Sequence, residues 1–324
     1  MRMFVTGGNG FIGSVVVKML LESGWEVSCL LRPTSDISRL EGLKYKRVEG
    51  DVRQLASIEK GMEGCQGIIH LASLSSWTMI HSPEMNEIVL KGTDNVLQAA
   101  RKNGNTRTVF VSTATAINGT PNPVIQAEES PFVLDQKNYT YAYAKHEAEK
   151  LCARHVQDGA DLVIVNPAEV YGPNDITEVT SGTLIDFVRS SPVLVCPGGT
   201  SIVHVDDVAA GILKAFHKGR VGERYFLGGD NLTLKQLAQL TIDILGQKKK
   251  IVVLPRWLIL AIAKVGKTLH LPLPFNPEVI PYAILYWFFD NSKARNELGA
   301  TFRSATETLK PTLDWLRISG KISG

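Results

Sequence analysis

The stretch Val5-Thr6-Gly7-Gly8-Asn9-Gly10-Phe11-Ile12-Gly13 decides the fold. An apolar run ends at Thr6 and a helical apolar period begins at Ile12, so the glycines lie at a strand-to-helix turn. Gly7 permits the tight turn, Gly10 lets backbone N–H groups approach a pyrophosphate, and Gly13 lets the helix pack closely. The spacing is Gly-x-x-Gly-x-x-Gly, yet its place on the first βα unit predicts dinucleotide binding at Gly7, Gly10, Phe11, Ile12 and Gly13.

Short β-branched runs alternate with amphipathic stretches as far as residue 166. This alternation predicts an α/β fold with a doubly wound parallel (Rossmann) sheet over residues 1–166. Beyond Pro167 the turns come closer together and prolines concentrate between residues 255 and 281. Residues 167–324 are therefore expected to form mainly a smaller α/β substrate lobe, with some segments returning to the Rossmann sheet. The expected strands are 3–6, 26–31, 44–48, 67–71, 107–112 and 162–165, and the main expected helices are 12–21, 83–102 and 139–156.

Composition narrows the partners. The chain has 324 residues with Lys+Arg 35 against Asp+Glu 32, a formal charge of +3, and no dominant basic cluster. We therefore expect a small-molecule substrate and no nucleic acid. The four cysteines are scattered, which predicts buried free thiols and neither a disulfide framework nor a metal site.

Targeting signals are not expected at the start of this sequence. The first strand begins at Met3, which leaves no room for a leader segment, and this favours a cytoplasmic location. The apolar runs at 257–263 and 282–289 are shorter than the ~20 residues that a membrane span needs. The run around 255–264 is the most apolar helix predicted. We expect it to pack within the second lobe; an apolar-substrate lid or contact with a membrane surface is the alternative for 255–270.

The end of the second expected strand bears on the choice of cofactor. An acidic residue about 20 positions beyond the glycine loop would bind the ribose 2′-OH of NAD. This sequence has Arg32 there, and Arg39 follows in the same loop. A guanidinium suits a 2′-phosphate, so NADP(H) is favoured over NAD(H). The alternative is that both arginines are merely solvated.

A second motif, Tyr139-Thr140-Tyr141-Ala142-Tyr143-Ala144-Lys145, carries the chemistry. Residues i and i+4 share a helix face, so Tyr141 and Lys145 can point together into one cleft. The ammonium favours the phenolate, which would let Tyr141 exchange a proton with a substrate oxygen. Only Tyr141 among the three tyrosines has a lysine at i+4.

With these motifs the sequence resembles the extended short-chain dehydrogenase/reductases over essentially its whole length, and in particular members like dihydroflavonol reductases and hopanoid-associated sugar epimerases. The resemblance implies that the glycine loop, Tyr141 and Lys145 hold a nicotinamide cofactor and catalyse redox chemistry. It also implies a homodimer formed through the helices near 83–102 and 139–156. The further cofactor contacts that it implies are Asp51, Val52, Leu71, Ala72, Ser73, Pro167 and Val170.

Two positions depart from the family pattern. Counting back from Gly119 places Ala114 on the catalytic hydroxyl position, and Val89 occupies a position that is commonly Asn. We expect Thr113 to polarise the substrate carbonyl, with Thr115 as the other candidate. Because Ala114 and Val89 replace these residues, weak catalytic activity is an alternative expectation.

The predicted function is an NADP(H)-dependent oxidoreductase that interconverts a ketone or aldehyde and an alcohol through Tyr141 and Lys145. One alternative is a redox-neutral nucleotide-sugar epimerase or dehydratase, for which Arg220, Arg224 and Arg256 could supply diphosphate contacts. Another is a non-catalytic protein that senses NADPH or acts as a scaffold. Loops that follow strands supply the candidate substrate contacts Trp77, Thr115, Asn118 and Glu169.

Overall fold

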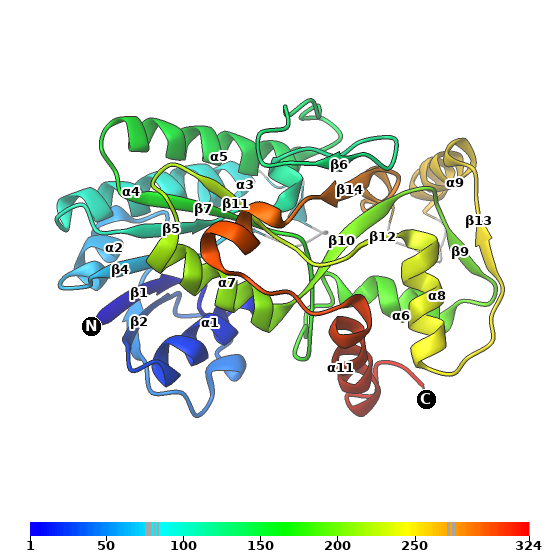
Figure 1. Ribbon diagram of the computed structural model, residues 1–324, viewed down its shortest axis with the longest axis horizontal. Coiled ribbons are helices and arrows are strands. Elements are labelled where there is room, and N and C mark those ends of the chain that lie inside the picture. The colour runs from blue at the N-terminus through cyan, green and yellow to red at the C-terminus, as the bar shows by residue number, and fades with distance from the viewer. Residues whose placement is uncertain (75–78, 81, 83, 271–272, 274–276, 324) are drawn as a thin grey trace.

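A seven-stranded parallel sheet forms the centre of the N-terminal half (Figure 1). The computed structural model describes residues 1–323 except 75–78, 81, 83, 271–272 and 274–276. The strand order reverses between β1 and β4, which confirms the doubly wound fold and places a crevice at their carboxyl ends. In spatial order the strands are β11 (Arg224–Leu227), β7 (Leu162–Pro167), β5 (Thr108–Val111), β4 (Gly67–His70), β1 (Arg2–Thr6), β2 (Glu26–Leu31) and β3 (Lys46–Glu49).

Helices cover both faces of this sheet, so its strands are apolar on both sides. In β1, Val5 packs into the core beneath α1 (Phe11–Glu22) and α7 (Val205–Lys218), whereas Phe4 packs into a separate core on the opposite face. That opposite face carries α2 (Leu55–Met62), α4 (Gly92–Lys102) and α5 (Thr140–Gln157).

The helix expected over 83–102 is observed from Glu84 to Lys102, but it is not a regular α-helix throughout. It is divided into α3 (Glu84–Asn86), a π-helical turn (Glu87–Lys91) and α4. The Thr93 hydroxyl donates to the Val89 carbonyl at 2.6 Å within this region. The apolar period alone therefore predicted the helical segment but not the wide turn, because a π turn disturbs the pattern by only one residue.

The C-terminal half builds a second layer. A five-stranded mixed sheet joins β8 (Glu169–Tyr171), β10 (Gly199–His204), β12 (Asn231–Thr233), β14 (Tyr286–Phe289) and β6 (Ile125–Gln126), and β9 (Val193–Val195) pairs with β13 (Ile251–Val253). A separate apolar core lies among α6 (Ser181–Arg189), α8 (Leu234–Ile244) and α11 (Ala305–Ile318). The other α-helices within the described residues are α9 (Arg256–Leu269) and α10 (Ile280–Ala283).

The two halves exchange strands. β11 comes from the C-terminal half yet pairs with β7, and β6 comes from the N-terminal half yet pairs with β14. All four cysteines are buried free thiols. No helix within the described part of the chain combines the length and the apolar character that a membrane-spanning segment needs.

Candidate functional site

The glycine loop is shaped by close backbone contacts. Gly7 has φ +71°, and the Gly10 N–H donates to the Gly7 carbonyl at 3.0 Å. A Cβ on Gly13 would lie 2.1 Å from the Gly7 oxygen, so only glycine fits there. Helix α1 starts at Phe11 with no side-chain cap and no acidic residue in its first turn. Its N-terminal N–H groups are thus oriented for an anion such as a pyrophosphate.

Arg39 is folded back onto this loop. Its Nε donates to the Asn174 carbonyl at 3.0 Å and its Nη1 to the Asn9 carbonyl at 3.5 Å. The remaining nitrogen, Nη2, is buried and has no hydrogen-bond partner. An unpaired buried guanidinium nitrogen beside a dinucleotide loop fits an anionic cofactor group.

Arg32 and Asp51 lie at the ends of the neighbouring strands. The Arg32 side chain is exposed. Asp51 accepts hydrogen bonds from Arg53 Nε at 3.0 Å and from Nη2 at 2.7 Å. The Arg53 hydrogen bonds lower the pKa of Asp51, and Arg32 contributes to the same shift. The neighbouring Val52 is buried in the core beneath α2 and α4.

Behind the loop, a buried chain of hydrogen bonds links β1, β4 and the π turn. The Ala72 N–H donates to Thr6 Oγ1, which lies 2.7 Å from His70 Nδ1. His70 Nε2 lies 3.1 Å from Thr93 Oγ1. Since the Thr93 hydrogen is given to Val89, Thr93 accepts from Nε2–H and Thr6 donates to Nδ1. Burial, and secondarily Lys145, lowers the pKa of His70 to about 3, so this histidine is neutral.

Tyr141 is the centre of the polar cluster at the carboxyl edge. It is the second residue of α5, and the side chains of Ser73 and Thr113 lie close enough to its phenol to influence its pKa, although Ser73 Oγ is buried without a hydrogen-bond partner. Burial raises the pKa of Tyr141 to about 12, while Ser73 and Thr113 act in the opposite direction. The structure therefore brings together three hydroxyl groups from α5, from the segment after β4 and from the end of β5.

Lys145 lies one turn further along α5 and is 2% exposed. Its Nζ donates to the Val111 carbonyl at 3.1 Å and lies 4.9 Å from the centroid of the Phe110 ring. Burial lowers the pKa of Lys145 to about 8, and the Glu149 carboxylate opposes this shift. The ammonium thus sits at the point where its charge responds to small changes of environment.

Thr113 rather than Ala114 presents its side chain to Tyr141. Ala114 is buried in the apolar core beneath α5, whereas Thr113 and Thr115 are partly exposed with their hydroxyl oxygens 3.2 Å apart. The Thr113 carbonyl accepts from Asn166 Nδ2 at 2.9 Å, which fixes the end of β5. Of the two hydroxyl groups that the sequence offers in place of Ala114, that of Thr113 is the one that influences the Tyr141 phenol.

Glu149 is a buried carboxylate that the sequence analysis missed. Its Oε1 accepts from Asn166 Nδ2 at 2.6 Å, and its Oε2 pairs with Arg224 at 3.1 Å. Through Asn166 it connects Lys145 on α5 to the Thr113 carbonyl, two residues after β5. Its position four residues after Lys145 was the available signal.

The remaining candidates are spread around the site. Asn118 is 5% exposed and its Oδ1 has no hydrogen-bond partner, while Glu169 accepts from the Tyr171 hydroxyl at 2.6 Å and its pKa is raised by burial. Pro167 ends β7, and Val170 is buried in the core. Leu71 and Ala72 are partly buried after β4. Trp77 lies outside the described residues.

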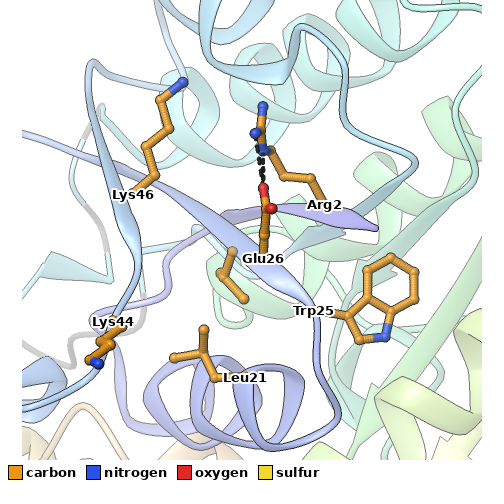
Figure 2. Close-up of a pocket in the computed structure, with 7 residues that line it drawn as sticks. Arg2, Leu21, Trp25, Glu26, Lys44 and Lys46 are labelled. Atoms are coloured by element: carbon orange, nitrogen blue, oxygen red, sulfur yellow. Dashed lines mark hydrogen bonds and ion pairs between the residues drawn. The ribbon is translucent and has the colours of Figure 1, made fainter.

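A pocket elsewhere on the molecule does not share the features of this site. A pocket of about 230 Å³ lies at the amino ends of β1, β2 and β3, lined by residues such as Arg2, Glu26 and Lys46 (Figure 2). It is on the opposite edge of the sheet from Tyr141 and the glycine loop. Within the described residues, no group of His, Cys, Asp or Glu side chains is arranged to hold a metal ion.

Comparison with known proteins identifies the family. The model of the NAD dependent epimerase/dehydratase family matches residues 3–228. The chain belongs to this family. It is 33% identical to a putative dihydroflavonol 4-reductase from Synechocystis sp., over 98% of this chain and 95% of that protein.

Two further relatives extend the comparison within the family. The chain is 29% identical, over 99% of its length and 97% of the relative, to a Stigmatella aurantiaca ketoreductase named for a farnesylated dihydroquinoline oxide. The crystal structure of a Thermotoga maritima UDP-glucose 4-epimerase with UDP-glucose superimposes with a TM-score of 0.80 at 25% identity, covering 98% of this chain and 99% of that one. This family of extended short-chain dehydrogenase/reductases contains NAD(P)-dependent reductases, epimerases and dehydratases, and the chain is an enzyme of this type.

Proposed function

We propose that this chain is an NADP(H)-dependent reductase that converts a ketone or aldehyde into an alcohol, or catalyses the reverse reaction. The observation that carries the proposal is the cluster in which the Tyr141 phenol meets the Thr113 side chain one helical turn from the buried ammonium of Lys145. A proton donor, a hydroxyl that can polarise a carbonyl and a nearby cation are the groups that carbonyl reduction requires.

Each residue has a defined task in this proposal. When bound, the nicotinamide supplies the hydride, or receives it in the reverse direction. Thr113 donates a hydrogen bond to the carbonyl oxygen, and Tyr141 transfers its phenolic proton to the oxygen as the alkoxide develops. Lys145 is assigned the task of stabilising the phenolate that remains, because burial raises the pKa of Tyr141 to about 12 and so makes its phenol a weak acid. Pro167 and Val170 would line the nicotinamide pocket.

NADP(H) is the proposed cofactor because Arg39 offers a buried, unpartnered Nη2 beside the glycine loop. Arg32, exposed at the end of β2, would approach the same phosphate from the solvent side. Two guanidinium groups favour a 2′-phosphate over a free hydroxyl. Asp51, Val52 and residues 71–73 would complete the cofactor site.

An apolar carbonyl compound is the proposed substrate class. The relatives with reductase names act, by those names, on a dihydroflavonol and on a farnesylated quinoline.

The structural similarity to a UDP-glucose 4-epimerase favours the redox-neutral alternative. Against it, Arg220 pairs with Glu297 at 2.7 Å, Arg224 pairs with buried Glu149, and Arg256 donates to two backbone carbonyls. The three cations considered for a sugar diphosphate are thus engaged within the fold.

A homodimer through α4 and α5 is a further part of the proposal. These helices pack side by side and are joined by a contact of 2.8 Å between His155 Nε2 and Asp94. They therefore present one continuous helical surface on the outside of the sheet (Figure 1).

The test is oxidation of NADPH and NADH by the purified protein in the presence of aromatic, steroid-like and long-chain ketones and aldehydes, with Tyr141→Phe in parallel. We expect turnover with NADPH that falls roughly 10²-fold to 10⁴-fold in the variant, as for loss of a positioned acid. Saturable NADPH binding without turnover of any carbonyl would favour the sensor instead. Interconversion of nucleotide sugars without net NADPH consumption would favour the epimerase.

A further inference from the structure

We propose that the outer face of α9 is a docking site for an anionic lipid surface. Helix α9 and β13 lie at the end of the molecule farthest from the N-terminus (Figure 1). The proposal rests on the side chains that this helix leaves in solvent and on the charge of the segment around it.

The inner face of α9 is accounted for by packing. Ile259 and Ala263 lie in a small apolar core together with Cys196, Ile280 and Ile284. This core holds the helix against α10 and the rest of the lobe, which confirms that the helix packs within it. The exposed side chains of the opposite face take no part in this core.

The outer face is nevertheless apolar. Trp257 is 70% exposed, Leu260 39%, Val265 51% and Leu269 61%. On α9 these four positions cover about half of the helix circumference, and exposed Lys264 lies between Trp257 and Leu260 on this face. An exposed tryptophan at the first turn of an apolar helical stripe is typical of helices that lie in a membrane interface.

The positive charge of residues 244–277, which include α9, favours an anionic partner. From Ile244 to Pro277 the chain contains no Asp or Glu, but it contains six cationic residues, while the whole protein has a formal charge of only +3. The rest of the chain is therefore net negative. Lys249 and Arg256 are bound to backbone carbonyls within the fold, whereas Lys248, Lys250 and Lys264 are exposed. Lys264 lies on α9 itself, and Lys248 and Lys250 lie in the connection that leads into β13. An exposed lysine within an apolar helix face, in a segment without acidic residues, complements phospholipid headgroups.

The position of α9 links this surface to the catalytic helix. Its inner core includes Ile280 and Ile284 on either side of Tyr282, whose ring makes an edge contact with Tyr139 at 5.3 Å. The Ala142 N–H, next to Tyr141, lies 3.5 Å from the Tyr282 hydroxyl oxygen. If the proposed function holds, an apolar substrate dissolved in the bilayer would meet the enzyme near Tyr141; the lipid contact itself does not depend on that function.

The experiment is vesicle flotation with the full chain, without substrate or cofactor. One set of vesicles contains phosphatidylglycerol and phosphatidylcholine in equal parts, and the other contains phosphatidylcholine alone. We expect binding to the anionic vesicles that weakens as the ionic strength rises and that is at least roughly tenfold weaker with phosphatidylcholine alone. Trp257→Ser with Val265→Ser should reduce binding to anionic vesicles by roughly tenfold or more, because the apolar contact is removed.

Two controls separate this result from general stickiness and from misfolding. Ile318→Ser removes another exposed apolar side chain, 86% exposed at the end of α11, and should leave binding unchanged. The double variant should keep the wild-type melting temperature, since both side chains are exposed. Absence of binding to anionic vesicles at low ionic strength would overturn the proposal. So would a dimer, detected by light scattering, that Trp257→Ser abolishes, because that face would then belong to a second copy of the chain.

Discussion

The two edges of the seven-stranded sheet differ in how far their charged and titratable side chains are exposed to solvent. At the amino edge, Arg2 and Glu26 form an ion pair 2.9 Å long whose side chains are 36% and 70% exposed (Figure 2). At the carboxyl edge, Tyr141 and Lys145 have pKa values that burial moves to about 12 and about 8. Both edges carry cationic groups, but only the carboxyl edge buries one of them, Lys145, almost completely. A hollow lined with charges is thus a weaker indication of function than a cluster of desolvated titratable groups.

The largest effect is expected where the carboxyl edge approaches the cofactor. Gly13→Ala places a Cβ within 2.1 Å of the Gly7 oxygen. We expect loss of saturable NADPH binding and a fall of about 1–3 kcal/mol in the free energy of unfolding, because backbone must move. Fluorescence titration and urea denaturation measure the two effects. Gly182→Ala on α6 is the control, since its Cβ would meet only Glu178 Cβ at 3.9 Å; equal losses in both variants would contradict the close-approach argument.

The sequence was sufficient for most of this edge because its signals are local. Six of the seven strands of the Rossmann sheet lie within two residues of the expected bounds, whereas β11 was not expected as a strand. Tyr141 with Lys145 needed only helical periodicity. Pairings between distant segments left no such signal: Ser73 reaches Tyr141 across 68 residues, and Asn166 fixes Thr113 across 53. The second sheet is built from strands as short as two residues with mixed directions, which no simple alternation reveals.

The next effect tests which hydroxyl serves the carbonyl. Thr113→Ala should lower kcat roughly 10²-fold to 10³-fold, as for removal of one hydrogen-bond donor to a developing oxyanion. Thr115→Ala should lower it by less than about tenfold, because that hydroxyl contacts Thr113 rather than Tyr141. Steady-state kinetics of both variants, with the ketone that the wild type reduces fastest, shows which threonine contacts the carbonyl. Thr113→Ser should restore most of the rate, and a larger loss from Thr115→Ala would transfer the role to Thr115.

A smaller effect concerns cofactor choice. Arg39→Ala should raise the Kd for NADPH about 10-fold to 100-fold, since a charge-assisted bond to the phosphate is lost, and should change the Kd for NADH by less than about threefold. Calorimetric titration with each dinucleotide measures both. Arg47→Ala is the matched control, because Arg47 donates to the Arg32 and Pro33 carbonyls on the neighbouring loop. A parallel loss of NADH affinity in Arg39→Ala would show that Arg39 only supports the loop.

The pH dependence of kcat should show the effect of the Glu149 charge on Lys145. Its negative charge opposes the burial that lowers the pKa of Lys145 to about 8. Glu149→Gln keeps an oxygen for Asn166 but removes the charge, so the pKa of Lys145 falls further and the ammonium is lost at lower pH. In the reduction direction, the decline of kcat at high pH should therefore begin at lower pH than in the wild type, with a loss of a few-fold near neutrality. A profile displaced to higher pH, or a uniform loss at every pH, would leave Glu149 a purely structural role.

The smallest effect is expected at the amino edge. Glu26→Gln removes the carboxylate that pairs with Arg2, but both side chains are already in contact with water. Exposed ion pairs contribute about 0–1 kcal/mol, so the free energy of unfolding should change by no more than that, and less at high salt. The kcat/KM of the proposed carbonyl reduction should stay at the wild-type value, because the pair lies at the opposite edge of the sheet from Tyr141. If Glu26→Gln impaired turnover as strongly as the carboxyl-edge variants, exposure would not separate the functional edge from the other, and the pocket of Figure 2 would have to be treated as a second site.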